Sequence, residues 1–161
     1  MLAGYVAAKM GLPVERLIVA TNVNDILART LETGTYEVRG VVATSSPAMD
    51  IQVSSNFERL LFDASGRDAS VVRDAMRDLA ASGRFALNAK TLANMRDIFA
   101  ASRADEGETA DTIREVYRTN GYVLDPHTAV GVAVARKLGA DKANAPLVVL
   151  GTAHPAKFPE A

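Results

Sequence analysis

Two runs of consecutive apolar residues constrain the fold of this chain most strongly. Each run is four residues long and is followed directly by small, polar or turn-forming residues: Leu17-Ile18-Val19-Ala20 and Leu147-Val148-Val149-Leu150. Strands that are buried on both faces read as continuous apolar runs, which is typical of parallel sheets. The two runs therefore predict strands of a parallel sheet. In open α/β sheets ligands bind beyond the carboxyl ends of such strands, which makes the following turns candidate binding sites.

Helical spacing and helix-end signals account for much of the remaining chain. Apolar residues recur at helical spacing from Asp68 to Ser82, and Gly83 follows as a stop signal. Asp125 and Pro126 are a natural N-cap and a natural first residue of another helix. Further helices are predicted over residues 2–10, 26–33, 57–64 and 89–101 and around 113–117. Strands and helices in this order predict an α/β fold with a parallel-sheet core.

The middle of the chain differs from its two ends. Residues 57–119 are dominated by amphipathic helices with charged outer faces and little strand between them. We interpret them as a helical insertion in a single partial domain that covers residues 1–161. A chain of 161 residues with 48% hydrophobic and 23% charged residues can bury the core of one ordinary domain.

Charge and cysteine content exclude several classes of function. The formal net charge is −1 without a basic stripe, so nucleic-acid binding has no electrostatic support. The absence of cysteine excludes disulfides and thiolate metal sites, which fits a cytoplasmic protein. No apolar run approaches the roughly 20 residues that span a bilayer, so no membrane association is expected.

Two polar segments offer amide and hydroxyl groups for a polar substrate. The substrate-pocket candidates are Asn22, Asn24, Asp25, Ser54, Ser55 and Asn56. These residue types also form turns and helix caps, so both roles stay open at this point. Thr152 follows the second apolar run, where its hydroxyl could meet a cofactor, although a threonine that caps the next helix would fit the same position.

Histidine and lysine side chains give no strong catalytic signal. His127 and His154 each follow a predicted strand, but no carboxylate stands near them at metal-ligand spacing. We expect structural or hydrogen-bonding roles for both and no metal site. A lysine that forms a Schiff base needs a desolvated pocket. Only Lys157, of the five lysines, lies near a predicted strand end, and we expect it to be solvated. No residue of this chain is therefore assigned as catalytic.

The chain resembles the threonine synthase family at five blocks that occur in the same order. The blocks cover residues 3–13, 20–27, 46–59, 125–129 and 152–158, with Ala20-Thr21-Asn22-Val23-Asn24-Asp25 and Thr152-Ala153-His154-Pro155-Ala156-Lys157-Phe158 among them. The resemblance spans essentially the whole sequence and is weakest in the central helical segment.

Membership of that family implies a fold and a reaction. The fold is that of the fold type II (tryptophan synthase β-like) enzymes that use pyridoxal 5'-phosphate (PLP). The reaction converts O-phospho-L-homoserine and water to L-threonine and phosphate, with PLP as an electron sink. In this fold type a neutral hydroxyl typically faces the pyridine nitrogen of PLP, and Thr152 matches that position in the closing motif.

Two motifs of the family do not occur in this sequence. The Schiff-base lysine of the family stands in a Phe-Lys-Asp context and its phosphate loop reads Gly-Asn-Phe-Gly. The first predicted helix also lacks an N-cap residue ahead of it. We therefore expect a C-terminal portion that is inactive alone and needs the missing N-terminal part as its partner. A non-catalytic remnant or interaction module, and another fold type II enzyme such as a dehydratase, are the alternatives.

Overall fold

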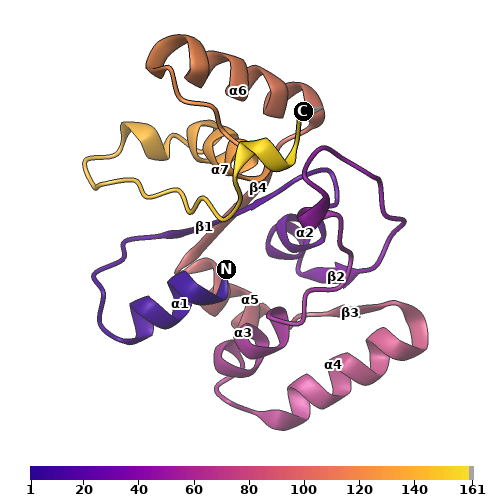
Figure 1. The fold of residues 1–161 in the computed structure, drawn as a ribbon. Coiled ribbons are helices and arrows are strands. Elements are labelled where there is room, and N and C mark those ends of the chain that lie inside the picture. Colours follow the sequence, from indigo (N-terminus) through magenta and orange to yellow (C-terminus); the bar gives the residue numbers. More distant parts are fainter. Residues whose placement is uncertain (160–161) are drawn as a thin grey trace. The chain divides into compact units, whose positions relative to one another are not determined.

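The computed structural model describes residues 1–159, which form two compact units (Figure 1). Unit 1 consists of Met1–Val19, Ile26–Gly40 and Gln52–Ala101. Unit 2 consists of Ala20–Asp25, Val41–Ile51 and the described residues from Ser102 onward. Each unit thus combines three separate stretches of the chain, so residues that are distant in sequence build each one.

Strands β1 (Leu17–Thr21) and β4 (Phe99–Arg103) pair with each other. The Leu17 amide donates to the Ile98 carbonyl at 2.8 Å, and the Ala104 amide donates to the Thr21 carbonyl at 3.0 Å. Residue numbers rise together along this pair, so the strands are parallel. The α/β class and the parallel sheet are confirmed, and so is the first apolar run as a strand.

The helix predicted over residues 89–101 is wrong beyond its first eight residues. Helix α5 covers Ala89–Arg96, and the following residues form β4. Leu92, Met95 and Phe99 keep helical spacing across this boundary, which is why the sequence pattern did not separate the two elements. The segment was expected to contain mainly helices with little strand, yet it supplies a strand of the parallel pair.

A second strand pair lies in unit 1 and was not predicted. Strands β2 (Thr35–Glu37) and β3 (Arg84–Ala86) are antiparallel, with Tyr36 opposite Phe85. Their two rings stack at a centroid distance of 5.0 Å. Each strand has only three residues, which is too short to show the alternation that identifies a strand in a sequence.

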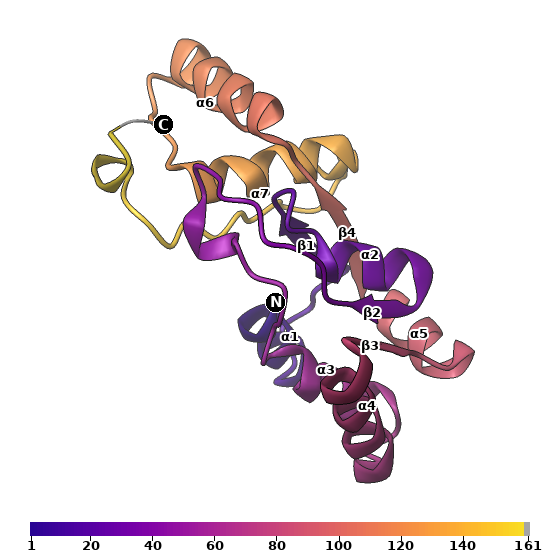
Figure 2. The ribbon, with the colours of Figure 1, turned by 90° about the vertical axis from the view of Figure 1, so that its right-hand side faces the viewer.

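The remaining helices of unit 1 follow the sequence prediction closely. They are α1 (Leu2–Lys9), α2 (Ile26–Thr33), α3 (Phe57–Ala64) and α4 (Ala69–Ser82). The Asp68 carboxylate caps α4 by accepting the Ser70 amide, and Gly83 ends that helix with a left-handed φ of 73°. Figure 2 shows α3, α4 and α5 close to β2 and β3.

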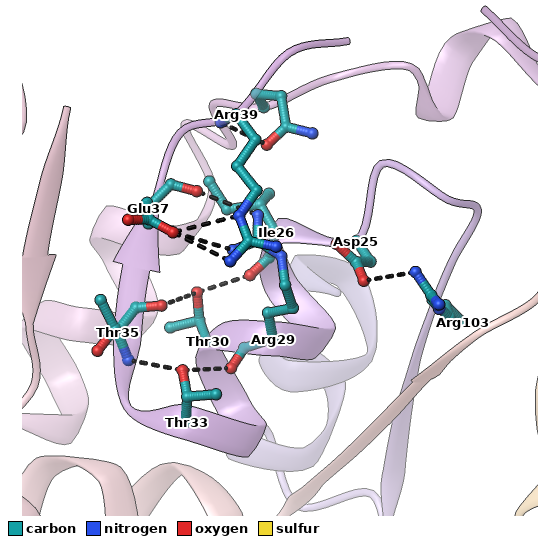
Figure 3. A network of polar contacts seen from close by, with 10 residues as sticks. Asp25, Ile26, Arg29, Thr30, Thr33, Thr35, Glu37, Arg39 and Arg103 are labelled. Carbon is teal, nitrogen blue, oxygen red and sulfur yellow. Dashed lines mark hydrogen bonds and ion pairs between the residues drawn. The ribbon is translucent and has the colours of Figure 1, made fainter. Parts of the chain in front are cut away.

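Helix α2 and strand β2 are joined by side-chain bonds to backbone carbonyls (Figure 3). The Arg29 guanidinium donates to the Glu37 carbonyl at 3.1 Å, and the Thr30 hydroxyl donates to the Thr35 carbonyl at 3.4 Å. These bonds satisfy polar groups next to the apolar core of unit 1, where an unpaired group would be costly.

Unit 2 contains two long helices that lie side by side (Figure 1). Helix α6 (Glu106–Asn120) begins with a capping box in which Asp105 and Glu108 bond each other's backbone amides. Helix α7 (Pro126–Lys137) begins at the predicted N-cap and first residue. Short 3-10 helices complete the unit at Pro47–Met49 (η1), Ala140–Lys142 (η2) and Pro155–Lys157 (η3). No helix within residues 1–159 is long and apolar enough to cross a membrane.

The second apolar run, residues 147–150, is not a strand, so this prediction is wrong. Leu147, Val148 and Leu150 are 43%, 76% and 65% exposed, and no strand of the described residues pairs with them. Only Val149 faces inward, and a Cβ built on Gly131 of α7 would come 3.0 Å from its Cγ1. A continuous apolar run becomes a buried strand only when neighbouring strands bond its backbone and cover its two faces.

Candidate functional site

The loop that follows β1 carries two buried asparagines. Asn22 and Asn24 are 1% and 3% exposed. The Asn22 amide nitrogen donates to the Thr44 hydroxyl at 2.9 Å, to the Ser46 hydroxyl at 3.0 Å and to the Asp50 carboxylate at 2.7 Å. Its oxygen accepts the Asn24 backbone amide at 2.9 Å. One side chain therefore joins the residues that follow β1 to the segment Val41–Ile51.

Asn24 and Asp50 complete this network. The Asn24 side chain bonds both backbone groups of Val42, accepting from the amide and donating to the carbonyl at 2.8 Å each. Asp50 accepts from Asn22, from Asn24 at 2.9 Å, and from both the hydroxyl and the amide of Thr44 at 2.7 and 2.9 Å. A carboxylate with several donors is a strong organising centre for irregular backbone.

The sequence prediction included Asn22 and Asn24 but missed Thr44, Ser46 and Asp50 as members of this site. One signal was available, because the polar turn from Thr44 follows a short apolar stretch, as the asparagine loop follows β1. Asp25 stands at the edge of the network and pairs with Arg103 at 3.2 Å (Figure 3).

The first turn of α7 is a second centre of unit 2. Asp125 accepts the backbone amides of His127 and Thr128 at 3.0 and 3.4 Å, and it also accepts the Thr128 hydroxyl. Burial works to raise the pKa of Asp125, but the hydrogen bonds from Thr128 and His127 together outweigh it, so the pKa lies below its ordinary value. Asp125 is therefore a buried carboxylate that stays ionised.

His127 is 8% exposed and uses both ring nitrogens. Its Nε2 accepts the Ala48 backbone amide at 3.1 Å, and its Nδ1 lies 3.0 Å from the Asp125 carboxylate. Because Nε2 is an acceptor, the ring hydrogen belongs on Nδ1 and points to Asp125. The expected hydrogen-bonding role of this histidine is the one that the structure displays.

The segment after residue 150 is folded onto the same turn. A Cβ built on Gly151 would come 3.3 Å from the Thr128 hydroxyl oxygen, and the Phe158 ring lies 4.9 Å from the His127 ring. The His154 Nδ1 accepts the Ala156 amide at 3.2 Å and so caps η3. Thr152 is exposed, and within residues 1–159 its hydroxyl has no hydrogen-bond partner.

The remaining candidates belong to unit 1. The Ser54 amide donates to the Tyr36 hydroxyl at 2.9 Å, and the Ser55 carbonyl accepts from Arg59 at 3.1 Å. Asn56 is the N-cap residue of α3 without a side-chain capping bond. Asn22, Asn24, Asp25 and Thr152 thus share unit 2, whereas these three residues form part of the other unit. No cluster of three histidine or acidic side chains in the described part of the chain is suited to a metal ion.

Comparisons with known proteins extend this picture. Residues 128–161 match the family model described as threonine synthase, C-terminal. Threonine synthase of Pseudomonas aeruginosa is 47% identical over this whole chain, which spans 34% of that protein. The PLP-bound threonine synthase structure from Brucella melitensis is 60% identical, with a TM-score of 0.93 over 99% of this chain and 34% of that one. Over its whole length the chain matches part of threonine synthases in sequence and in structure.

The chain matches only part of the length of known threonine synthases. Threonine synthase from yeast is 42% identical, with a TM-score of 0.90 over 98% of this chain and 34% of that one. The chain spans about a third of the length of these relatives and matches their C-terminal part. Within that part, unit 2 brings the asparagine loop, the segment Val41–Ile51, the first turn of α7 and the closing residues into one bonded arrangement.

Proposed function

We propose that this chain supplies the C-terminal third of a threonine synthase, which converts O-phospho-L-homoserine and water to L-threonine and phosphate with PLP. The observation that carries the proposal is the 60% identity and the TM-score of 0.93 to the PLP-bound threonine synthase. The match covers 99% of this chain. The substrate is a small anionic molecule, in keeping with a site lined by amide and hydroxyl groups.

Thr152 is the residue that we assign to PLP. Its exposed hydroxyl is unbonded within residues 1–159, and its neighbour Gly151 packs against α7, so the hydroxyl is available to a ligand. A neutral hydroxyl can accept from or donate to the pyridine nitrogen without placing a second charge beside it. Bound PLP supplies an electron sink, and the protein supplies orientation and electrostatics.

The residues of each polar loop are proposed, each loop within its own unit, as substrate-pocket residues. Asn22 and Asn24 use their amides to fix the segment Val41–Ile51, so their contribution is shape and the placement of backbone amides. Asp25 stands beside them. Ser54, Ser55 and Asn56 offer hydroxyl, amide and backbone groups from unit 1. All six are substrate-pocket residues in this proposal, and none of them is assigned as catalytic.

The proposed partner is a polypeptide that corresponds to the preceding two thirds of a threonine synthase. Two observations support it: the chain spans 34% of its relatives, and its sequence contains neither Phe-Lys-Asp nor Gly-Asn-Phe-Gly. Without a lysine in that context, the 161 residues alone are proposed to form no threonine. The absence of cysteine fits a reducing compartment, and we place the protein in the cytoplasm without a nucleic-acid or membrane partner.

The exposure of Leu147, Val148 and Leu150 favours a second candidate, a non-catalytic module that binds a partner through this apolar segment.

A chimeric enzyme distinguishes threonine synthase from the alternative functions. This chain replaces the matching third of the Brucella melitensis enzyme, and threonine and phosphate are measured with O-phospho-L-homoserine and PLP. The proposal predicts that both products form in equal amounts. A folded, PLP-loaded chimera that instead deaminates serine or threonine would indicate a dehydratase. A folded, PLP-loaded chimera without turnover would favour the non-catalytic binding module.

A further inference from the structure

We propose that His127 is a positioning residue that fastens two segments to the first turn of α7 and thereby sets the place of the Thr152 hydroxyl. The assignment of Thr152 to PLP rests on the proposed function, whereas the fastening itself concerns this chain alone. The two segments are the loop that contains η1 and the closing residues 151–158.

The two ring nitrogens of His127 make its polar contacts. Asp125 receives the Nδ1 hydrogen, so the ring cannot rotate without losing a bond to a buried carboxylate. Nε2 is then aimed at the Ala48 amide in η1. The same loop holds Ser46 and Asp50, which bond Asn22. His127 therefore connects α7 to the asparagine network through one backbone amide.

The ring of His127 makes its apolar contact, which is with Phe158. Phe158 contacts the ring at a centroid distance of 4.9 Å and an interplanar angle of 58°, a tilted arrangement that is favourable between aromatic rings. At the other end of the closing segment, Gly151 packs against the Thr128 side chain, whose hydroxyl bonds Asp125. Thr152 lies between these two anchors, so its backbone is restrained from both sides.

Histidine combines a hydrogen-bond donor for Asp125, an acceptor for the Ala48 amide and a ring that contacts Phe158. Glutamine can replace the hydrogen bonds in part but offers no ring to Phe158, and phenylalanine offers the ring but leaves the Ala48 amide and Asp125 without a partner. The two variants His127→Gln and His127→Phe therefore separate the polar fastening from the apolar one.

The first test uses the 161-residue chain and nitrogen-15 NMR at mildly alkaline pH. The Nδ1–H tautomer is expected for His127, and the opposite tautomer is expected for His154, because its Nδ1 is the acceptor. The chain has two histidines, so His154→Gln assigns the signals. Backbone order of residues 151–158 should fall in His127→Gln, which removes the ring that contacts Phe158, and protection of the Ala48 amide should fall in His127→Phe, while α6 stays unchanged in both. An Nε2–H tautomer for His127 would overturn the proposal, and so would unchanged order of residues 151–158 in His127→Gln together with unchanged protection of the Ala48 amide in His127→Phe.

The second test uses the active chimera and a double-mutant cycle with Thr152→Val. His127→Gln should lower kcat by roughly 10- to 100-fold with KM within about twofold, because displacement of a catalytic contact by about 1 Å costs on this order. If His127 acts through Thr152, the double variant loses little beyond Thr152→Val. If the losses in kcat of the His127 variant and of Thr152→Val add fully in the double variant, the positioning role is overturned. Arg118→Gln, at the exposed end of α6, is the control for substitution in unit 2.

The two tests fail in different ways. An inactive unsubstituted chimera would count against the proposed function, while the tautomer and the order of residues 151–158 would still decide whether His127 fastens the closing segment. A chimera that is active but insensitive to His127 would reject the inference and leave the proposed function in place.

Discussion

The interiors of the two units are built from different chemistry. The hydrophobic core cluster lies in unit 1, where Ile26, Phe57, Leu61 and Met95 are almost fully buried. The interior of unit 2 has smaller apolar residues on α7 and many polar ones, with these buried: Thr21, Asn22, Asn24, Ser46, Thr109, Thr112, Asp125 and His127. Apolar burial is non-directional, whereas hydrogen bonds fix direction. Unit 2 can therefore hold irregular loops in defined places, which is what a ligand site requires.

Removal of a large apolar side chain from unit 1 should have the largest effect on stability. Phe57 is 2% exposed and its ring lies 4.9 Å from that of Tyr36. Phe57→Ala should lower the free energy of unfolding by about 3–5 kcal/mol, because it leaves a cavity in the core. Phe62→Ala on the exposed side of α3 is the control and should cost less than about 1 kcal/mol. Equal losses in urea unfolding would contradict an apolar core in unit 1.

Removal of a polar group from unit 2 should have a smaller and more local effect. Asn22→Leu keeps the approximate volume but leaves donors and acceptors unpaired, at a cost of about 1–3 kcal/mol. Hydrogen exchange should accelerate at the Val42 and Thr44 amides, which donate to Asn24 and Asp50. Asn120→Leu, at the exposed end of α6, should leave both amides protected. Unchanged exchange in Asn22→Leu would show that the network does not hold the loop.

An ion-pair cluster between α1 and α3 should make unit 1 sensitive to acid. The Tyr5 hydroxyl donates to Asp63, and Lys9 and Arg67 pair with the same carboxylate at 3.0 and 3.1 Å. The bond from Tyr5, followed by those from Lys9 and Arg67, holds the pKa of Asp63 far below its ordinary value. A carboxylate with a depressed pKa stabilises the fold above its unfolded pKa of about 4 and loses this contribution as the pH falls toward the folded value.

Tyr5→Phe tests this cluster. The variant should lower the unfolding free energy by about 1 kcal/mol at neutral pH, and the difference from the parent should shrink below about pH 4. Urea unfolding across this pH range measures both quantities. A difference that stays constant with pH would show that the tyrosine acts through packing rather than through the Asp63 carboxylate.

The smallest effect on stability is expected at the exposed apolar segment. Val148 is 76% exposed, so Val148→Lys should change the unfolding free energy of this chain by no more than about 0.5 kcal/mol. The same change should abolish association with the N-terminal two thirds of a threonine synthase if residues 147–150 are buried in that complex. Gel filtration of the mixture measures it, and Thr119→Lys on α6 is the control. Undisturbed association would place the contact elsewhere.

Local signals predicted most helices of both units but not the strand partners. Gly83, Asp125 and Pro126 marked helix ends by backbone chemistry that operates over a few residues. Strands depend on partners distant in the sequence, and the same four-residue apolar pattern gave a strand at residues 17–20 but an exposed segment at 147–150.

The site was predicted in part for the same reason. Asn22 and Asn24 stood out because they follow a strand, and the closing motif singled out Thr152. The hydrogen-bond partners of Asp50 and His127 could not be predicted, because they lie up to 79 positions away in the sequence. Their bonding pattern depends on how the three stretches of unit 2 come together.

The central claim, that this chain completes the active site of a threonine synthase, is tested most directly by mixing. The purified 161-residue chain is combined with a separate polypeptide that covers the preceding two thirds of the Brucella melitensis enzyme, together with PLP and O-phospho-L-homoserine. The account predicts equal amounts of threonine and phosphate from the mixture and none from either polypeptide alone. Threonine from this chain alone, or a stable PLP-containing complex without turnover, would contradict it.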